Sequence, residues 1–368
     1  MIYLDYAANT PVDDEVLEVF NEATKKYIAN PNSSHPLGRM AKEEIDRCSS
    51  SIAKYFDMKR ESVIYTSGSS ESNNLVIKGI AESRKKYGNK IIISAVEHSS
   101  IVAPSNYLIN YGYDVSIIPL TKEGIIDLEE LKKEIDDNTI LVSICTVDSE
   151  LGTIQPIQDI VNIVKKYPNC IFHTDATQAI GKVNIDYSNV DFITFAPHKF
   201  FGLNGFGVLL NRNNIKISPL IHGGKSTTIY RSGTPVTANV ISLEKALSKS
   251  LNNLDERYNY VMELNKILRN ELSRLECVHV NSPKNSIPNT LNISLINKDT
   301  KSIIKKLEEN GICISTGSAC SMEGSPSKSV LAITGDKNLS LNTIRISISH
   351  LTANEEIKMF LRIFEILL

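Results

Sequence analysis

The strongest constraint on this chain is a regular alternation between short β-branched runs and amphipathic segments, from about residue 61 to residue 211. The runs have the length of strands and cover residues 62–66, 90–95, 115–119, 139–146, 170–175, 191–196 and 207–211. The amphipathic segments between them, at 72–87, 128–135 and 157–166, have helical spacing. This alternation predicts an α/β fold with a mostly parallel seven-stranded sheet that helices cover on both faces.

The rhythm changes after Thr234. A long helix is predicted over 240–275, then a strand at 290–296, a helix at 302–310, and strand-like segments at 311–315 and 343–349. This α+β pattern predicts a smaller second domain. We therefore expect a large domain at residues 13–250, and a small domain made of residues 1–12 and 251–368.

Charge and composition exclude several classes of protein. The 40 Lys and Arg residues against 42 Asp and Glu residues leave no basic excess that would favour direct binding of nucleic acid. The apolar runs are far shorter than the roughly 20 residues that span a bilayer, and polar residues interrupt the N-terminus where a signal peptide would be apolar. Six cysteines without a Cys-x-x-Cys pair favour free thiols over disulfides or a metal site. We expect a cytoplasmic protein that binds a small polar substrate.

The residues that follow the predicted strands carry most of the chemistry, because ligands of an open parallel sheet bind beyond the carboxyl ends of its strands. Ser67-Gly68-Ser69-Ser70 follows the first strand and opens a helix. Free N–H groups at such a helix start can bind a phosphate. The same residues would also serve as an ordinary helix cap with Glu71 in the first turn, so this segment alone leaves both interpretations open.

Three later strand ends add the remaining groups. His98 follows the second strand, Asp175 ends the fifth with Gln178 three residues later, and His198-Lys199 follows the sixth. Each residue alone is more often structural. Together with the helix start they match what pyridoxal phosphate needs: an amine for a Schiff base, a carboxylate that keeps the pyridinium charged, a stacking imidazole and an anion site.

Collinear motifs extend this match over nearly the whole chain. They are Tyr3 to Pro11, Asn30 to His35, Thr66 to Gly68, Glu71 to Asn74, Glu97-His98, Asp175 to Gln178, His198-Lys199, His222 to Gly224, Arg231 to Thr234 and Ser315 to Cys320. By these motifs the chain resembles the cysteine desulfurases of the NifS and IscS kind, which belong to the class V, fold-type I pyridoxal-phosphate enzymes. The resemblance implies the fold of that class, with pyridoxal 5'-phosphate as cofactor and L-cysteine as substrate.

The resemblance also implies a role for individual residues. Lys199 would carry the cofactor, Asp175 would face the ring nitrogen, His98 would stack on the ring and Gln178 would bond the ring hydroxyl. Ser69, Ser70 and His198 would hold the phosphate, with Thr234 reaching across from a second subunit of a homodimer. Ser149 would lie beside the cofactor, and Arg345 would bind the substrate carboxylate through its planar guanidinium.

Cys320 distinguishes a desulfurase from an aminotransferase within this resemblance. It lies among small residues, Gly317-Ser318-Ala319 before it and Ser321 after it. The implied reaction uses Lys199 as general base, the Cys320 thiolate to take the sulfur as a persulfide, and His98 to move protons. The persulfide would then pass to an acceptor protein for iron–sulfur cluster assembly or for thiolation of tRNA or a cofactor. Cys313, between two isoleucines, is expected to be a buried core thiol.

Two departures from the family pattern keep alternatives open. Ser149 replaces an amide beside the cofactor, and Ala196 stands where relatives usually have a serine that contacts phosphate. A selenocysteine lyase or a class V aminotransferase would share most of these motifs. A dimeric scaffold without catalytic activity is a further alternative, although the presence of Lys199, Asp175 and Cys320 argues against it.

Overall fold

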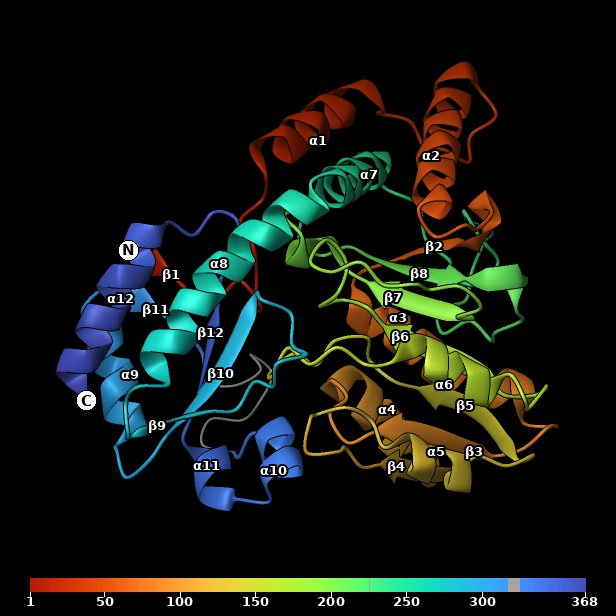
Figure 1. The fold of residues 1–368 in the computed structure, drawn as a ribbon. Helices are drawn as coiled ribbons and strands as arrows, with labels where there is room; N and C mark the ends of the chain where they lie inside the picture. Colours follow the sequence, from red (N-terminus) through yellow and green to blue (C-terminus); the bar gives the residue numbers. More distant parts are fainter. Residues whose placement is uncertain (225, 317–324) are drawn as a thin grey trace.

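A seven-stranded sheet forms the centre of the molecule in the computed structural model, which describes residues 1–224, 226–316 and 325–368 (Figure 1). Its strands are β2 (Val63–Thr66), β3 (Lys90–Ser94), β4 (Asp114–Ile118), β5 (Thr139–Ser143), β6 (Ile171–Asp175), β7 (Phe192–Phe195) and β8 (Gly207–Asn211), in the order β2-β8-β7-β6-β5-β3-β4. Strand β8 runs in the opposite direction to the other six strands of this sheet. The predicted mostly parallel sheet is confirmed, and each predicted strand matches an observed one.

Helices cover both faces of this sheet because alternate strand residues point to opposite sides. Ile91 and Ile93 belong to a core cluster with Leu75 of α3 (Ser69–Arg84), whereas Ile92 belongs to a second cluster with Ile160 of α6 (Ile157–Val164). The helices around the sheet are α1 (Asp14–Lys26), α2 (Pro36–Lys54), α3 (Ser69–Arg84), α4 (Ser99–Ile109), α5 (Leu128–Glu134), α6 (Ile157–Val164) and α7 (Thr237–Asn252). None of the helices in the described ranges is long and apolar enough to cross a bilayer.

A second group of elements has its own hydrophobic core. Strands β9 (Val278–Val280), β10 (Thr290–Leu295) and β12 (Thr343–Ser347) form an antiparallel sheet, and β1 (Ile2–Tyr3) pairs in parallel with β11 (Ile312–Cys313). Helices α8 (Leu254–Leu272), α9 (Thr300–Glu309), α10 (Lys328–Thr334), α11 (Lys337–Leu341) and α12 (Asn354–Leu367) complete this part. The N-terminal strand thus lies among C-terminal elements (Figure 1). The expected domain boundaries at 12/13 and 250/251 stay a prediction.

One sequence prediction was wrong. The single helix expected over 240–275 is two helices, α7 and α8, which meet at Asn253. The Asn253 side chain donates from Nδ2 to the Lys249 carbonyl oxygen at 2.7 Å. An asparagine that bonds to its own backbone in this way competes with helix continuation, and hydrophobic periodicity alone does not show it.

Candidate active site

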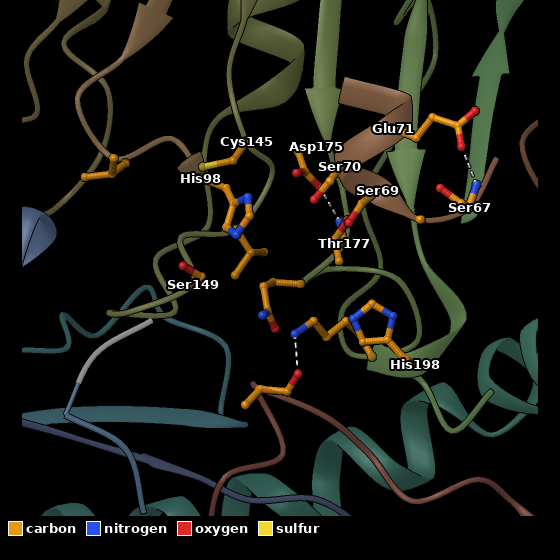
Figure 2. Close-up of a pocket in the computed structure, with 16 residues that line it drawn as sticks. Ser67, Ser69, Ser70, Glu71, His98, Cys145, Ser149, Asp175, Thr177 and His198 are labelled. Atoms are coloured by element: carbon orange, nitrogen blue, oxygen red, sulfur yellow. Dashed lines mark hydrogen bonds between the residues drawn. The ribbon is translucent and has the colours of Figure 1, made fainter. Parts of the chain in front are cut away.

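A cavity of about 400 Å³ opens at the carboxyl ends of the sheet strands (Figure 2). It is lined by Ala8, Ser67, Gly68, Ser69, Ser70, Glu71, Val96, His98, Cys145, Val147, Ser149, Asp175, Thr177, Gln178, His198 and Lys199. The structure therefore gathers every residue predicted to contact the cofactor from this chain. Cys320 lies outside the described residues.

Asp175, the last residue of β6, is held firmly at the cavity wall. Its Oδ2 accepts a hydrogen bond from Asn73 Nδ2 at 2.7 Å, and its Oδ1 accepts one from the Thr177 backbone N–H at 3.0 Å. The Thr177 hydroxyl is buried and has no hydrogen-bond partner in the described ranges. A carboxylate fixed in this way suits a protonated ring nitrogen, and the unpartnered hydroxyl leaves a donor for a ligand.

His98 is joined to Asp175 through Asn73 and Ser100. Asn73 Nδ2 also donates to Ser100 Oγ at 2.8 Å, and Ser100 Oγ lies 2.8 Å from His98 Nδ1. The Ser100 backbone N–H donates to the same Nδ1 at 3.1 Å, so a neutral imidazole carries its proton on Nε2. Burial, more than the nearby Lys199 and Lys328, lowers the pKa of His98, while Asp175 opposes that shift. His98 is therefore neutral near pH 7.

The start of α3 forms the anion end of the cavity. Its N-cap is Gly68, which supplies no side-chain cap, and Ser69 and Ser70 occupy the first helical positions. Glu71 does not cap the helix start: its Oε2 accepts from the Ser67 N–H at 2.7 Å, and its Oε1 pairs with Arg231 Nε at 2.9 Å. The N–H groups and hydroxyls at this helix start therefore suit an anionic ligand.

His198 lines the same cavity. Burial first, and then the charges of Lys199 and Lys182, lower the pKa of His198 to about 4. A neutral imidazole at this position can still donate one N–H to a phosphate oxygen. Ala196, where relatives usually have serine, is fully buried and does not line the cavity.

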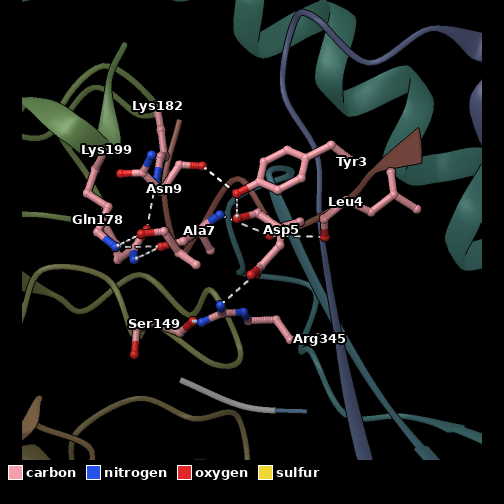
Figure 3. A network of polar contacts seen from close by, with 12 residues as sticks. Tyr3, Leu4, Asp5, Ala7, Asn9, Ser149, Gln178, Lys182, Lys199 and Arg345 are labelled. Carbon is pink, nitrogen blue, oxygen red and sulfur yellow. Dashed lines mark hydrogen bonds and ion pairs between the residues drawn. The ribbon is translucent and has the colours of Figure 1, made fainter. Parts of the chain in front are cut away.

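Lys199 and Gln178 contact the N-terminal segment of the chain (Figure 3). Lys199 Nζ donates to the carbonyl oxygens of Ala7 at 2.9 Å and Ala8 at 2.5 Å. Gln178 Nε2 donates to the same Ala7 oxygen at 2.9 Å, and its Oε1 accepts from Lys182 Nζ at 2.6 Å. The amine and the amide expected at the cofactor are thus positioned by backbone carbonyls.

Two predicted residues do not line the cavity. Arg345 on β12 is only 1% exposed: one guanidinium nitrogen pairs with Asp5 Oδ1 at 2.9 Å, and another donates to the Ser149 carbonyl oxygen at 3.0 Å. It lies behind Ser149, and its role toward a substrate carboxylate stays a prediction. Thr234 lines a separate hollow of about 140 Å³ that shares Ser67 with the cavity. Its contact with cofactor in a second subunit also stays a prediction.

The donor set fits pyridoxal phosphate. Asp175 offers a carboxylate for the ring nitrogen, and His98 offers an imidazole face. Lys199 offers an amine, Gln178 an amide, and the N-terminus of α3 an anion site, all at one cavity. This is the combination of groups that the cofactor requires.

Sequence reasoning missed several residues that support the site. Asn73 lies four residues after Ser69 on α3, so helical spacing was an available signal for it, whereas Lys182 lies four residues after Gln178 in a turn that gives no such signal. Asp5 lies in the motif Tyr3 to Pro11, but the motif does not indicate what its side chain contacts. Its ion pair with Arg345 joins residues 340 positions apart, which spacing cannot reveal.

One of two further cysteines differs from expectation. Cys145 lines the cavity, and burial raises its pKa well above the ordinary value, so this thiol is protonated at neutral pH. Cys313, expected to be a buried core thiol, is only partly buried because β11 is a two-residue strand that pairs with β1 alone.

Comparison with known proteins shows which family this chain resembles. A family model described as Aminotransferase class-V matches residues 2–360. The chain is 37% identical over 369 residues to cysteine desulfurase IscS of Dictyoglomus turgidum, covering 99% of this chain and 93% of that protein. It is 38% identical over 365 residues to cysteine desulfurase IscS of Buchnera aphidicola subsp. Baizongia pistaciae, covering 97% and 90%.

Solved structures give the same result. A NifS-like protein matches with a TM-score of 0.93 and 33% identity, covering 100% of this chain and 99% of that chain. The apo cysteine desulfurase of Thermococcus onnurineus NA1 matches with a TM-score of 0.86 and 26% identity, covering 100% and 94%.

Proposed function

This chain belongs to the aminotransferase class-V family, and from that premise we propose that it is a pyridoxal-phosphate-dependent cysteine desulfurase. It converts L-cysteine to L-alanine and transfers the sulfur to an acceptor protein. The observation that carries the proposal is the single cavity that combines the Lys199 amine, the Asp175 carboxylate and the N-terminus of α3. Curated relatives named cysteine desulfurase, aligned over nearly the whole chain, support the choice of substrate.

Different residues of the cavity would contact different parts of the cofactor. Ser69, Ser70 and His198, which line the cavity, would hold the phosphate, and Asp175 would pair with the ring nitrogen. After its transfer from the Lys199 amine to the amino group of the substrate, pyridoxal phosphate would supply an electron sink that makes the α-proton acidic, and the amine of Lys199, released from the cofactor, could accept that proton. His98 contributes a neutral ring at the cavity wall, consistent with stacking on the cofactor.

Lys199 acts as the general base toward the substrate α-proton. The carbonyl oxygens of Ala7 and Ala8 hold its Nζ at the base of the cavity, so the amine has a defined position from which to accept that proton. His98 carries a proton on Nε2 and gives or takes protons at the substrate thiol and at the carbon that becomes the alanine methyl group. Arg345 fixes the substrate carboxylate.

Cys320 is the nucleophile that receives the sulfur. Its thiolate attacks the substrate sulfur, the carbon–sulfur bond breaks with its electrons left on the carbon side, and Cys320 keeps the sulfur as a persulfide. A thiol of the acceptor protein then removes this sulfur. We also propose that the protein works in the cytoplasm as a homodimer in which Thr234 completes the phosphate site of the partner subunit.

Replacement of Cys320 tests the reaction. Cys320→Ala is expected to keep the cofactor spectrum and its change on addition of cysteine, yet to lose persulfide and alanine formation. A nucleophile acts only in sulfur transfer, so turnover falls far more than substrate affinity. Persulfide is measured by trapping and mass spectrometry, and alanine by amino-acid analysis.

Cys313→Ala is the matched control, because Cys313 lies on β11, does not line the cavity and is expected to contribute only packing. Near-normal sulfur release by Cys320→Ala with loss in Cys313→Ala would mean that the wrong thiol was named. Activity in both variants would favour a selenocysteine lyase, and amino transfer to a keto acid would favour an aminotransferase. Purified protein that never binds the cofactor would favour a scaffold.

A further inference from the structure

Lys182 is a buried lysine next to the site with no assigned role. Its residue is only 9% exposed, and its hydrogen bond in the described ranges runs from Nζ to Gln178 Oε1 at 2.6 Å (Figure 3). It does not line the main cavity. It lies on the other side of Gln178, where it and Lys199 line a small hollow of about 20 Å³.

The charges around Lys182 do not explain why an ammonium is buried there. No carboxylate forms an ion pair with it in the part of the chain that the structure describes, and the nearest charged influences are the cations Lys199 and Arg345. Arg345 itself is paired with Asp5. The other titratable residues of the small hollow are Tyr6, Arg257, Tyr258 and His350. A buried ammonium without a counter-charge is costly, so a ligand is the natural source of one.

Lys182 also fixes which way the Gln178 amide faces. Because the Ala7 carbonyl oxygen can only accept, Nε2 must face it, and Oε1 is left to accept from Lys182, so the amide cannot be flipped. One N–H of Nε2 goes to the Ala7 carbonyl oxygen, and Gln178 lines the cavity. The remaining N–H is therefore the group that Gln178 can offer to a ligand, and the ligand atom must be an acceptor.

We propose that Lys182 is a positioning residue that acts through Gln178 to stabilise the anionic ring oxygen of bound pyridoxal phosphate. The inference rests on the proposed cofactor site and adds Lys182 as the source of the positive charge that compensates this anionic oxygen. The ammonium polarises the amide that donates to the oxygen and supplies a positive charge behind it.

The electrostatics of Lys182 agree with this role. Burial, followed by the charges of Lys199 and Arg345, lowers the pKa of Lys182 to about 7. The anionic ring oxygen of the cofactor, separated from Lys182 by Gln178, would favour the protonated form of Lys182 again. Binding of the cofactor therefore favours the charged form of Lys182, and this charge in turn stabilises the bound cofactor.

The test is the pH titration of the visible absorption of the cofactor bound to Lys199. Loss of the proton from the lysine–cofactor linkage leaves a net negative charge on the nearby ring oxygen, which a cation stabilises. Lys182→Met should therefore raise the pH midpoint of this transition by about one unit. It should also weaken cofactor binding by the apoprotein. Lys182→Arg, which keeps the charge, should restore most of the midpoint.

Lys90→Met is the matched control, because Lys90 is an equally buried lysine at the opposite ends of the strands, bonded to the Glu134 carbonyl oxygen. It should leave the midpoint unchanged. If Lys182→Met does not fold, Lys182→Gln replaces it as the neutral variant of Lys182. An unchanged midpoint in a neutral variant that binds cofactor overturns the role of Lys182 alone. Absence of the absorption band in the unmodified protein overturns the cofactor site itself.

Discussion

The cavity has two walls that contribute in different ways. The strand-end wall presents side chains from the ends of the sheet strands and the segments that follow them: Ser69, Ser70, His98, Asp175, Gln178, His198 and Lys199. The N-terminal wall consists of Ala8, which lines the cavity, and of residues 5–7 and Arg345, which support it from behind; it contributes mainly backbone carbonyls that accept from Lys199 and Gln178. The first wall holds the reacting groups and the second positions them. A sequence motif identifies side chains that can react, but it does not identify backbone carbonyls that position them.

The N-terminal wall owes its position to the second core of the molecule. Ser347 of β12 accepts a hydrogen bond from the Ala7 N–H at 2.9 Å through its Oγ, and its own N–H donates to the Leu4 carbonyl oxygen at 2.8 Å. The small antiparallel sheet thus fixes the carbonyls that hold Lys199, which follows β7 of the large sheet. Substitutions in the two walls should therefore have different signatures.

The largest effect is expected from Lys199→Ala in the strand-end wall. The variant should lose the visible absorption of bound cofactor and all turnover, because the described cavity contains no other lysine. Absorption spectroscopy and alanine release measure both losses. Borohydride reduction followed by peptide mapping is the direct check: cofactor found on a different lysine would contradict the site.

The strand-end wall was predictable from sequence and the N-terminal wall was not. β-Branched runs locate the strand ends because side chains of parallel strands alternate between buried faces, and ligands bind where the strands stop. No comparable rule places the Ala7 carbonyl oxygen beside Lys199, since that contact joins residues 192 positions apart through a backbone atom. The break between α7 and α8 at Asn253 was not predicted for a related reason, because a local hydrogen bond from a side chain to the backbone leaves the hydrophobic periodicity unchanged.

Asp5→Asn is expected to have the next largest effect and tests the N-terminal wall. It removes the negative partner of a guanidinium that is almost fully buried. We expect a loss of about 2–3 kcal/mol in unfolding free energy, toward the low side of buried ion pairs because Asp5 is partly exposed. The KM for L-cysteine should rise while cofactor absorption persists. Denaturant unfolding and steady-state kinetics measure these effects.

Glu15→Gln is the control for Asp5→Asn, since Glu15 pairs with Lys245 and Lys249 at the surface. Removal of an exposed ion pair should change stability little. Equal losses in the two variants, or an unchanged KM in Asp5→Asn, would mean that the Arg345 ion pair has no special part in the N-terminal wall.

Asn73→Ala tests the support behind the strand-end wall and should have a moderate effect. It removes the donor to Asp175 Oδ2 and the donor to Ser100 Oγ. Loss of a hydrogen bond to a carboxylate should weaken pyridoxal-phosphate binding by about tenfold without abolishing the absorption band. Titration of apoprotein with cofactor measures the change. Asn74→Ala, which removes a bond to the Ser70 carbonyl oxygen, is the neighbouring control, and an equal loss there would point to helix stability instead.

Glu97→Gln should have the smallest effect on activity, and it tests whether the strand-end wall contains a carboxyl group that is kept neutral. Glu97 Oε1 accepts from Ser94 Oγ at 2.5 Å and from the Cys145 N–H at 2.8 Å, whereas its buried Oε2 has no partner in the described ranges. Burial, aided by the charge of Asp175, raises the pKa of Glu97 to about 8. Glutamine preserves the shape and the acceptor oxygen without the titration.

The sign of the pH effect follows from this raised pKa. Between pH 4.5 and about 8 the unfolded chain releases the proton of Glu97 and the folded protein keeps it, so this group destabilises the fold increasingly as the pH rises. Glu97→Gln removes that penalty. The Tm of the apoprotein variant should therefore exceed that of the parent by a margin that is small at pH 5 and reaches a few degrees at pH 8. A margin that does not change with pH would mean that Glu97 is ionised in the folded protein, and that the wall behind His98 is more polar than its contacts indicate.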